Sequence, residues 1–222
     1  MRNIVLLAAV ILLLSNNFAL TQQGGKRMSD KERWDGRYQR EMYIYGKEPA
    51  AFLKQKINML KKGEALVLAM GEGRNAVYLA QNGFNVTGVD ISGVAIDKCK
   101  KLAKERGTTV NAVVADLTDY KMGEAQYDLI TNFYFYDKSL FSPILNALKP
   151  GGIFILEQFS TDHPERGGNF GPRNPNYLVK PNELLEAFES LRILYYEDTV
   201  VELDEGMHKG PAALIRLIAQ KP

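Results

Sequence analysis

A glycine turn, Gly71-Glu-Gly-Arg-Asn-Ala76, carries the clearest sign of chemistry in this chain. Glycine permits a tight turn and lets a ligand approach the backbone without a Cβ in the way. The helix expected to begin near Arg74 points its free N–H groups at whatever lies over the turn. The spacing G-x-G-x-x-A therefore predicts a site for a nucleotide-like cofactor, and on its own it also fits the dinucleotide fingerprint.

Polar side chains follow the apolar segments that come next along the chain. Asp90 follows the segment 84–89, Asp116 follows 110–114, and Asn132 follows 127–131. In a parallel sheet these positions meet at the carboxyl edge, where a carboxylate such as Asp90 can bind ribose hydroxyls. Asp116 adds a second polar group that can meet an adenine edge, which favours a cofactor other than NAD.

The apolar segments that position these groups alternate with helical patterns. A buried run at Leu66–Leu68 precedes the glycine turn, and Lys149-Pro-Gly-Gly152 leads into another at 153–157. Such alternation predicts a Rossmann-like, doubly wound α/β sheet. We expect seven strands, mostly parallel, ending in an antiparallel C-terminal hairpin of 193–201 and 212–219 in place of a further βαβ unit. The polar segment 159–180 is expected to be a functional or mobile loop.

Composition narrows the class of protein. A chain of 222 residues with 45% hydrophobic content can bury one sizeable core. The net charge of +2 and the absence of a basic stripe argue against a nucleic-acid partner. The single cysteine, Cys99, lies in a helical pattern and is expected to be a half-buried apolar residue. No spacing typical of metal ligands occurs, so no metal site is predicted.

The N-terminus differs from the rest of the chain. The apolar run Ile4–Leu14 has the proportions of a signal peptide and is too short to span a bilayer comfortably. An alternative is that translation begins at Met28, where a segment typical of a soluble domain starts. We therefore separate residues 1–27, a signal-like or anchor segment, from a domain at 28–222 that begins with a helical extension.

Five motifs in register resemble the class I S-adenosylmethionine-dependent methyltransferases, and most closely the small-molecule branch with the tellurite-resistance and thiopurine-type enzymes. They are Gly71–Asn75, Val89–Ser92, Ala115–Leu117, Asp128–Asn132 and Leu148–Gly152. Further segments similar to that branch are Trp34–Tyr38, Tyr45-Gly46, Pro49, Gly171-Pro172, Asn174-Pro175 and Tyr177-Leu178. The chain departs from the family at two positions: Val67 replaces an acidic residue, and Ala69 replaces a glycine.

The resemblance implies S-adenosyl-L-methionine as the cofactor and assigns its contacts. Asp90 would bind the ribose hydroxyls, Ile91 and Leu117 would pack on the adenine, and Asp116 would meet its amino group. Asn132 would lie near the methionine part and the methyl group. The remaining cofactor positions that the resemblance implies are Arg37, Tyr45, Ala69, Gly71, Gly73 and Asn75.

The acceptor side is expected beyond the fourth and fifth strands. Tyr134 and His163, with Asn132, are the candidates for catalysis, and acceptor-binding candidates are Tyr136, Glu157, Arg173 and His208. Methyl transfer from an activated sulfonium mainly needs positioning and exclusion of water. A soft anion such as a thiolate or chalcogen oxyanion needs no strong base, whereas a neutral acceptor needs one within hydrogen-bond reach.

The predicted function is methyl transfer to a small-molecule acceptor, such as a thiol or a chalcogen oxyanion. Two alternatives are a regulatory protein that binds the cofactor without turnover and an NAD(P)-dependent oxidoreductase. Because the cofactor is made inside cells, we expect the domain on the cytoplasmic side. The segment 4–14 leaves a membrane tether or export open, and the residues indicate no oligomeric state.

Overall fold

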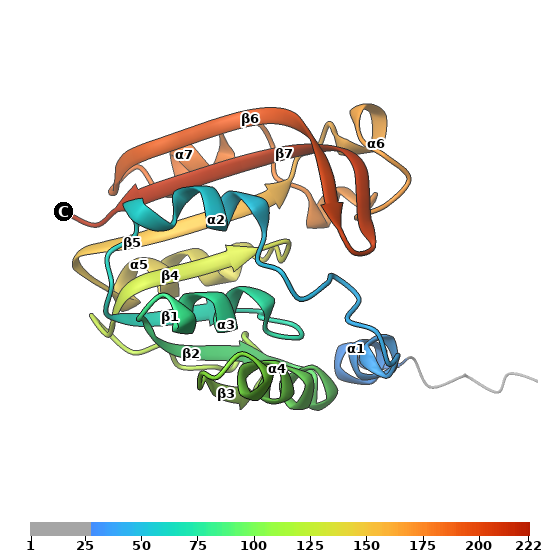
Figure 1. The fold of residues 1–222 in the computed structure, drawn as a ribbon. Coiled ribbons are helices and arrows are strands. Elements are labelled where there is room, and N and C mark those ends of the chain that lie inside the picture. Colours follow the sequence, from blue (N-terminus) through green and yellow to red (C-terminus); the bar gives the residue numbers. More distant parts are fainter. Residues whose placement is uncertain (1–27) are drawn as a thin grey trace, which may run out of the picture.

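The structure is a computed structural model that describes residues 28–222, so the signal-like segment expected at residues 1–27 lies outside the described residues. A seven-stranded sheet with the order β3-β2-β1-β4-β5-β7-β6 organises the chain (Figure 1). The strands are β1 (Glu64–Leu68), β2 (Asn85–Asp90), β3 (Asn111–Val114), β4 (Tyr127–Phe133), β5 (Leu148–Phe159), β6 (Arg192–Glu205) and β7 (His208–Gln220). The strands β1 to β5 pair in parallel, and β7 pairs antiparallel with both β5 and β6. The predicted fold class is confirmed.

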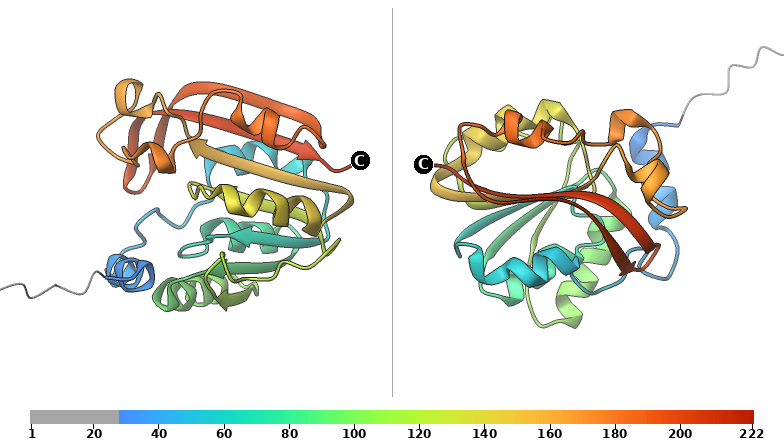
Figure 2. Two further views of the ribbon diagram at one scale, coloured as in Figure 1. Left: turned by 180° about the vertical axis from the view of Figure 1, so that it is seen from behind. Right: turned by 90° about the horizontal axis from the view of Figure 1, so that it is seen from above.

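Helices cover both faces of the sheet, as the views from behind and from above show (Figure 2). The helices α2 (Ala51–Lys56), α3 (Arg74–Gln81) and α4 (Gly93–Glu105) lie on one face, and α5 (Phe141–Ala147) and α7 (Glu183–Ala187) lie on the other. Strand β1 explains why both faces are apolar, because Ala65 and Val67 join one core cluster while Leu66 and Leu68 join the other. Such burial on both faces is typical of a central parallel strand.

Two elements frame the carboxyl edge of the sheet. Helix α1 (Asp30–Tyr38) begins with a capping box, in which Ser29 and Glu32 bind each other's backbone N–H groups. The helix ends at Tyr38, with Gln39 as its C-cap. Residues 39–50, which we call the N-terminal strap, leave the helix because their backbone groups bind side chains elsewhere. At the other side of the edge lies the tip of the β6–β7 hairpin (Figure 1).

The C-terminal strands are longer than the apolar pattern predicted. Strand β6 extends to Glu205 and β7 begins at His208, so only Gly206 and Met207 connect them. The predicted long loop after β5 contains helix α6 (His163–Arg166) and a short turn of helix η3 (Pro175–Tyr177); two other such turns are η1 (Ile57–Met59) and η2 (Lys138–Leu140). Within residues 28–222, no helix has the length and apolar character needed to cross a bilayer.

Candidate cofactor and acceptor site

A cavity of about 790 Å³ opens at the carboxyl edge of the sheet, between α1 and the tip of the β6–β7 hairpin. Its size lies within the roughly 300–1,000 Å³ typical of small-molecule pockets. The turns after β1, β2, β3 and β4 supply one side, and α1, the strap, the segment after β5 and the hairpin supply the rest. The cavity therefore lies where open α/β sheets bind their ligands.

The turn after β1 places its backbone against this cavity. Ala69 and Gly71 both line the cavity and both adopt positive φ, 45° and 56°. The Gly71 N–H donates a hydrogen bond of 2.8 Å to Asp90 Oδ2. A Cβ at Gly71 would lie 3.0 Å from the Tyr38 hydroxyl. Glycine therefore permits both the positive φ of this residue and the close approach of Tyr38.

Gly73 has a different function from the one expected. It does not line the cavity, and a Cβ on it would lie 2.3 Å from Cys99 Sγ of α4. Its φ of 87° also requires glycine. Gly73 therefore lets α4 pack closely on the turn, and the structure gives it no face toward a cofactor. Cys99 is buried, and burial raises the pKa of its thiol to about 12, as suits a core residue.

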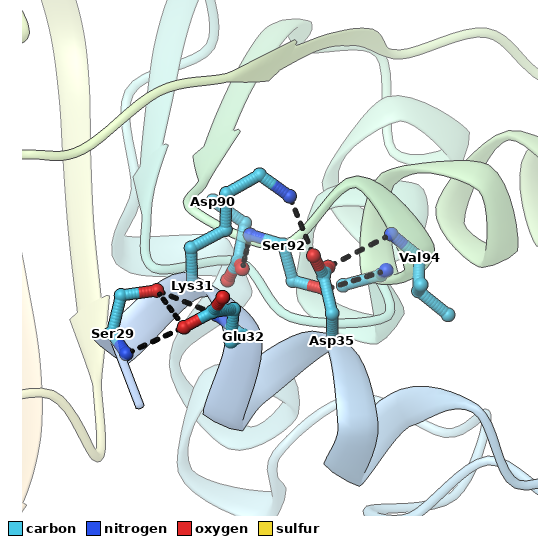
Figure 3. A network of polar contacts seen from close by, with 8 residues as sticks. Ser29, Lys31, Glu32, Asp35, Asp90, Ser92 and Val94 are labelled. Carbon is cyan, nitrogen blue, oxygen red and sulfur yellow. Dashed lines mark hydrogen bonds and ion pairs between the residues drawn. The ribbon is translucent and has the colours of Figure 1, made fainter. Parts of the chain in front are cut away.

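Asp90 connects the glycine turn, α4 and α1 in one polar network (Figure 3). Its Oδ1 accepts the Ser92 N–H at 2.9 Å, and the Ser92 hydroxyl donates to Asp35 of α1 at 2.6 Å. Asp35 also accepts the Val94 N–H, so it helps Ser92 to cap α4. Burial raises the pKa of the Asp90 carboxyl, and the hydrogen bonds from Ser92 and Gly71 oppose this.

The same end of the cavity fits a nucleoside. Each Asp90 oxygen uses one lone pair on a backbone donor, which leaves acceptor capacity for two hydroxyls. Ile91 and Leu117 provide apolar surface, and Asp116 lies beside them in the cavity wall. Asp116 Oδ1 accepts the backbone N–H and the hydroxyl of Thr118. The structure thus brings Asp90, Ile91, Asp116 and Leu117 together at one end of the cavity.

The three side chains next to the glycines hold the strap in place. Glu72 accepts the Ile44 N–H at 2.7 Å, Arg74 donates to the Tyr45 carbonyl at 3.1 Å, and Asn75 accepts the Ala50 N–H at 2.8 Å. Lys98 of α4 pairs with the second oxygen of Glu72 at 2.7 Å. Asn75 lines the cavity, but its side-chain oxygen is engaged by the strap. The turn therefore builds the wall of the site as well as its floor.

Arg37 and Tyr45 close the cavity from the N-terminal side, as expected. Both line it, and the Arg37 guanidinium lies 5.3 Å from the ring centroid of Trp34 and 5.8 Å from that of Tyr45. Within residues 28–222, no carboxylate forms an ion pair with Arg37. This cation therefore remains available to an anionic group in the cavity.

Of the residues predicted for the acceptor side, Tyr134, Tyr136 and His208 line the cavity. Tyr134 adopts a φ of 60°, an unusual conformation that often occurs at functional sites. Burial raises the pKa of its hydroxyl well above the usual value, and the carboxylates of Glu157 and Glu205 add to this effect.

Glu157 and Arg173 do not line the cavity. Glu157 is fully buried, accepts the Tyr134 hydroxyl at 2.6 Å, and pairs with Arg216 of β7 at 2.6 Å. It supports Tyr134 from behind and has no open route to an acceptor. Arg173 is exposed on the long loop and donates to Asn169.

His163 and Asn132, both expected at the reaction centre, also lie outside the cavity lining. His163 is 1% exposed; its Nε2 lies 2.7 Å from the Phe170 carbonyl, and its Nδ1 accepts the Ala213 N–H. Both nitrogens are thus bound to backbone, and His163 fastens the long loop to β7. Asn132 is still inside β4, paired with Leu68 and Leu156, and the cavity begins at Phe133.

Comparisons with known proteins identify methyltransferases as relatives of this chain. Residues 65–152 match a family described as a methyltransferase domain. An uncharacterised methyltransferase of Synechocystis sp. is 35% identical over 100 residues, which cover 42% of this chain and 45% of that protein. The 2-heptyl-1-hydroxyquinolin-4(1H)-one methyltransferase of Mycobacteroides abscessus is 32% identical over 110 residues, 44% of this chain and 46% of that protein. The crystal structure of TehB from Haemophilus influenzae superposes with a TM-score of 0.66 at 20% identity, covering 78% of this chain and 62% of that one.

The chain carries a class I S-adenosylmethionine-dependent methyltransferase domain. The predicted family is confirmed, and the likeness to TehB bears on the fold. The chain spans less than half the length of the two curated relatives, so the matched part is the domain rather than the whole of those proteins.

Several residues of the methyltransferase site were not predicted from the sequence. Glu72, Arg74 and Glu205 hold the strap and the hairpin, and Phe159 and Phe170 complete the aromatic wall. Only Glu72 and Arg74 carried a signal, because they lie inside the glycine motif. The other three come from segments that only the tertiary fold brings to the cavity.

Proposed function

We propose that this protein transfers the methyl group of S-adenosylmethionine to a small-molecule acceptor. The observation that carries the proposal is the Asp90 carboxylate, which faces the cavity with unused acceptor capacity beside the open backbone of Gly71. That pair suits a ribose, and the aromatic end of the same cavity leaves room for a second molecule. A protein that bound only the cofactor would not need the aromatic end of the cavity as well as the Asp90 end.

The residues at the cofactor end divide the binding between them. Asp90 accepts the ribose hydroxyls, Ile91 and Leu117 enclose the adenine, and Asp116 accepts from its amino group. Arg37 suits the carboxylate of the methionine part, because it is a cation in the cavity wall without an acidic partner among the described residues. When bound, the cofactor supplies an electrophilic methyl group on a positively charged sulfur.

The acceptor end favours a compact molecule that stacks on aromatic rings. Rings from the strap, from the carboxyl ends of β4 and β5, from the residue after β4 and from the long loop surround it: Tyr45, Phe133, Phe159, Tyr134 and Phe170. These rings and the strap exclude water, which is the main service that methyl transfer requires of a protein. The relative from Mycobacteroides abscessus is named for a hydroxyquinolinone acceptor, and this supports a small-molecule acceptor here. Thiols and chalcogen oxyanions belong to the same proposal.

Two measurements test the proposal. Calorimetric titration should show binding of S-adenosylmethionine, and a radiolabelled-methyl assay should show transfer to a member of a panel of thiols, aromatic hydroxyls, tellurite, selenite and small amines. Binding of NADH with no response to S-adenosylmethionine would instead favour an oxidoreductase. Cofactor binding without transfer to any member of the panel would favour a regulatory protein.

We also infer that the domain works on the cytoplasmic side of the membrane, where its cofactor is made. N-terminal sequencing of the protein from separated cell fractions tests this inference. A mature end near Leu20 in an exported fraction would contradict it, whereas a chain that begins at Met28 or retains the segment 4–14 would agree.

A further inference from the structure

His208 occupies the centre of the aromatic end of the cavity. It begins β7, is 7% exposed, and lines the cavity beside the hairpin tip. Its ring centroid lies 4.6 Å from that of Tyr45, 4.8 Å from Tyr134, 5.3 Å from Phe159 and 5.6 Å from Phe170. A polar side chain is thus held among aromatic rings in the wall of the cavity.

Neither ring nitrogen of His208 has a hydrogen-bond partner among residues 28–222. Nδ1 is fully covered and unpaired, whereas Nε2 is not among the covered atoms and is therefore the nitrogen that stays open to the cavity. A buried polar atom without a partner costs about 1–3 kcal/mol. Because protein atoms cover Nδ1, the nitrogen that a ligand in the cavity can reach is Nε2.

The charges around the ring keep the imidazole neutral. Burial, the largest cause, and the positive charges of Arg74 and Arg37 together lower the pKa of His208 to about 3. The tyrosines that face it are Tyr45 from the strap and Tyr134 from the segment after β4. A neutral imidazole has one nitrogen that accepts a hydrogen bond.

We propose that His208 Nε2 receives the proton of the methyl acceptor, and that the acceptor is a planar aromatic molecule with a hydroxyl or thiol at the reacting atom. This inference rests on the proposed methyl transfer and specifies its acceptor. The rings of Tyr45, Tyr134, Phe159 and Phe170 select a flat molecule, since aromatic pairs favour stacked and edge-to-face contacts. The nearby Arg37 and Arg74 disfavour a cationic acceptor.

The proton transfer balances in atoms and charge. The acceptor oxygen or sulfur forms a bond to the methyl carbon as the carbon–sulfur bond breaks, and the cofactor sulfur keeps that electron pair. The acceptor's own bond to hydrogen breaks, its electron pair stays on the acceptor, and the proton moves to His208 Nε2. One positive charge leaves the sulfur as one appears on the imidazole, so the charge in the cavity is unchanged.

A base with a low pKa is sufficient for this step. The acceptor's proton becomes much more acidic as the new bond to carbon forms, so His208 need not ionise the acceptor beforehand. The low pKa also keeps Nε2 unprotonated throughout the physiological range. The imidazolium passes its proton to solvent when the product leaves and the cavity opens.

Variants at His208 and on the same hairpin test the proposal. His208→Gln keeps an acceptor atom but cannot take up a proton, His208→Phe keeps the aromatic packing alone, and Lys209→Ala serves as the control. Lys209 is 76% exposed and pairs only loosely with Asp204 at 3.6 Å. The probes are 1-hydroxyquinolin-4(1H)-one, thiophenol and selenite, and each variant is first checked for thermal unfolding and for S-adenosylmethionine binding by calorimetry.

We expect wild type and Lys209→Ala to methylate one of the two aromatic probes. At a pH below the probe's own pKa, His208→Gln should lose at least about 100-fold in kcat with little change in KM, because a general base contributes roughly 10²- to 10⁴-fold. His208→Phe, which lacks the hydrogen-bond acceptor as well as the base, should show a lower kcat and a higher KM. The defect of His208→Gln should shrink as the pH rises through the probe's pKa, since an ionised acceptor needs no base. A merely structural role would give a defect that does not depend on the probe's ionisation.

A second readout does not depend on turnover. The chain has only two histidines, so the ring proton signals of His208 and His163 can be followed by NMR. The His208 signal should not titrate between pH 5 and 8, and it should shift when an aromatic probe is added with S-adenosylhomocysteine. Full kcat in His208→Gln below the probe's pKa, or transfer to selenite alone, would overturn the inference. If wild type does not bind S-adenosylmethionine at all, that result would instead contradict the proposed function itself.

Discussion

Asp90 combines a structural and a ligand-binding function in one carboxylate. Its oxygens hold the N–H groups of Gly71 and Ser92, and through Ser92 they reach Asp35 of α1. This position was predictable, because an acidic residue after the second strand of such a fold has a defined place. Its connection to α1 was not predictable, because Asp35 lies far away in the sequence and carries no signal of its own.

Replacing Asp90 by Asn should weaken cofactor binding by about 100-fold or more. The amide keeps one acceptor oxygen but presents an NH₂ group to one of the two backbone donors, and charged hydrogen bonds contribute about 1.5–3 kcal/mol each. Calorimetric titration with S-adenosylmethionine measures the change. Asp97→Asn, on the exposed side of α4, is the matched control and should bind as wild type does. Unchanged affinity in Asp90→Asn would remove Asp90 from the site.

At the scale of elements, apolar runs and glycine turns predicted the seven-stranded sheet and its antiparallel C-terminal hairpin. The pattern failed where strands continue through polar residues, as β6 does through Glu202–Glu205. There the partner strand supplies the pairing, and side chains buried by the tertiary fold replace the apolar signal. His208 was for this reason expected in a connection, although it begins β7.

A carboxylate joins the starting ends of three neighbouring strands. Asp128 of β4 accepts the Glu64 N–H of β1 at 3.1 Å, and it pairs with Lys149 of β5 at 2.7 Å and with Lys61. The hydrogen bond from Lys149 is the main cause that lowers its pKa from 3.8 to about 2. The ionised form is therefore stabilised in the folded protein.

This pKa shift predicts a loss of stability in acid. A carboxyl with a lowered folded pKa contributes its stabilisation above the unfolded pKa and loses it as the pH falls from about 4 to about 2. Because the lysines are partly exposed, we expect about 1–2 kcal/mol. Urea unfolding between pH 2 and 7 should show this slope in wild type and a shallower one in Asp128→Asn. Parallel curves for the two proteins would contradict the assignment.

At the scale of the whole molecule, one ion pair joins the glycine turn to the C-terminal hairpin. Arg74 of α3 pairs with Glu205 of β6 at 2.7 Å, and the two side chains are 9% and 7% exposed. Glu205 also accepts the Ala51 N–H of α2 and lies 3.2 Å from the Tyr134 hydroxyl. The glycine turn was predictable from local sequence, but this pairing was not, because 131 positions separate its partners.

Breaking this pair from one side should be costly. Glu205→Gln leaves the Arg74 charge buried without compensation, and we expect a loss of about 3 kcal/mol in the free energy of unfolding. The double variant Arg74→Met/Glu205→Gln should recover part of it, since no buried charge remains. Asp204→Asn, from the exposed pair on the same hairpin, should change stability by less than about 0.5 kcal/mol. Urea unfolding of the four proteins measures these differences, and a double variant no more stable than Glu205→Gln would contradict this account.

The strap contacts of Glu72, Arg74 and Asn75 also bear on how such motifs evolve. A glycine motif is usually treated as a record of selection by a ligand. Here the residues around its second glycine bind the N-terminal strap of the same chain. Substitutions at Glu72 should therefore be inherited together with changes at Lys98, and substitutions at Arg74 with changes at Glu205, whichever acceptor a descendant comes to use. The residues of the motif therefore vary with the residues that form the cavity wall, and the acceptor can change while these contacts stay the same.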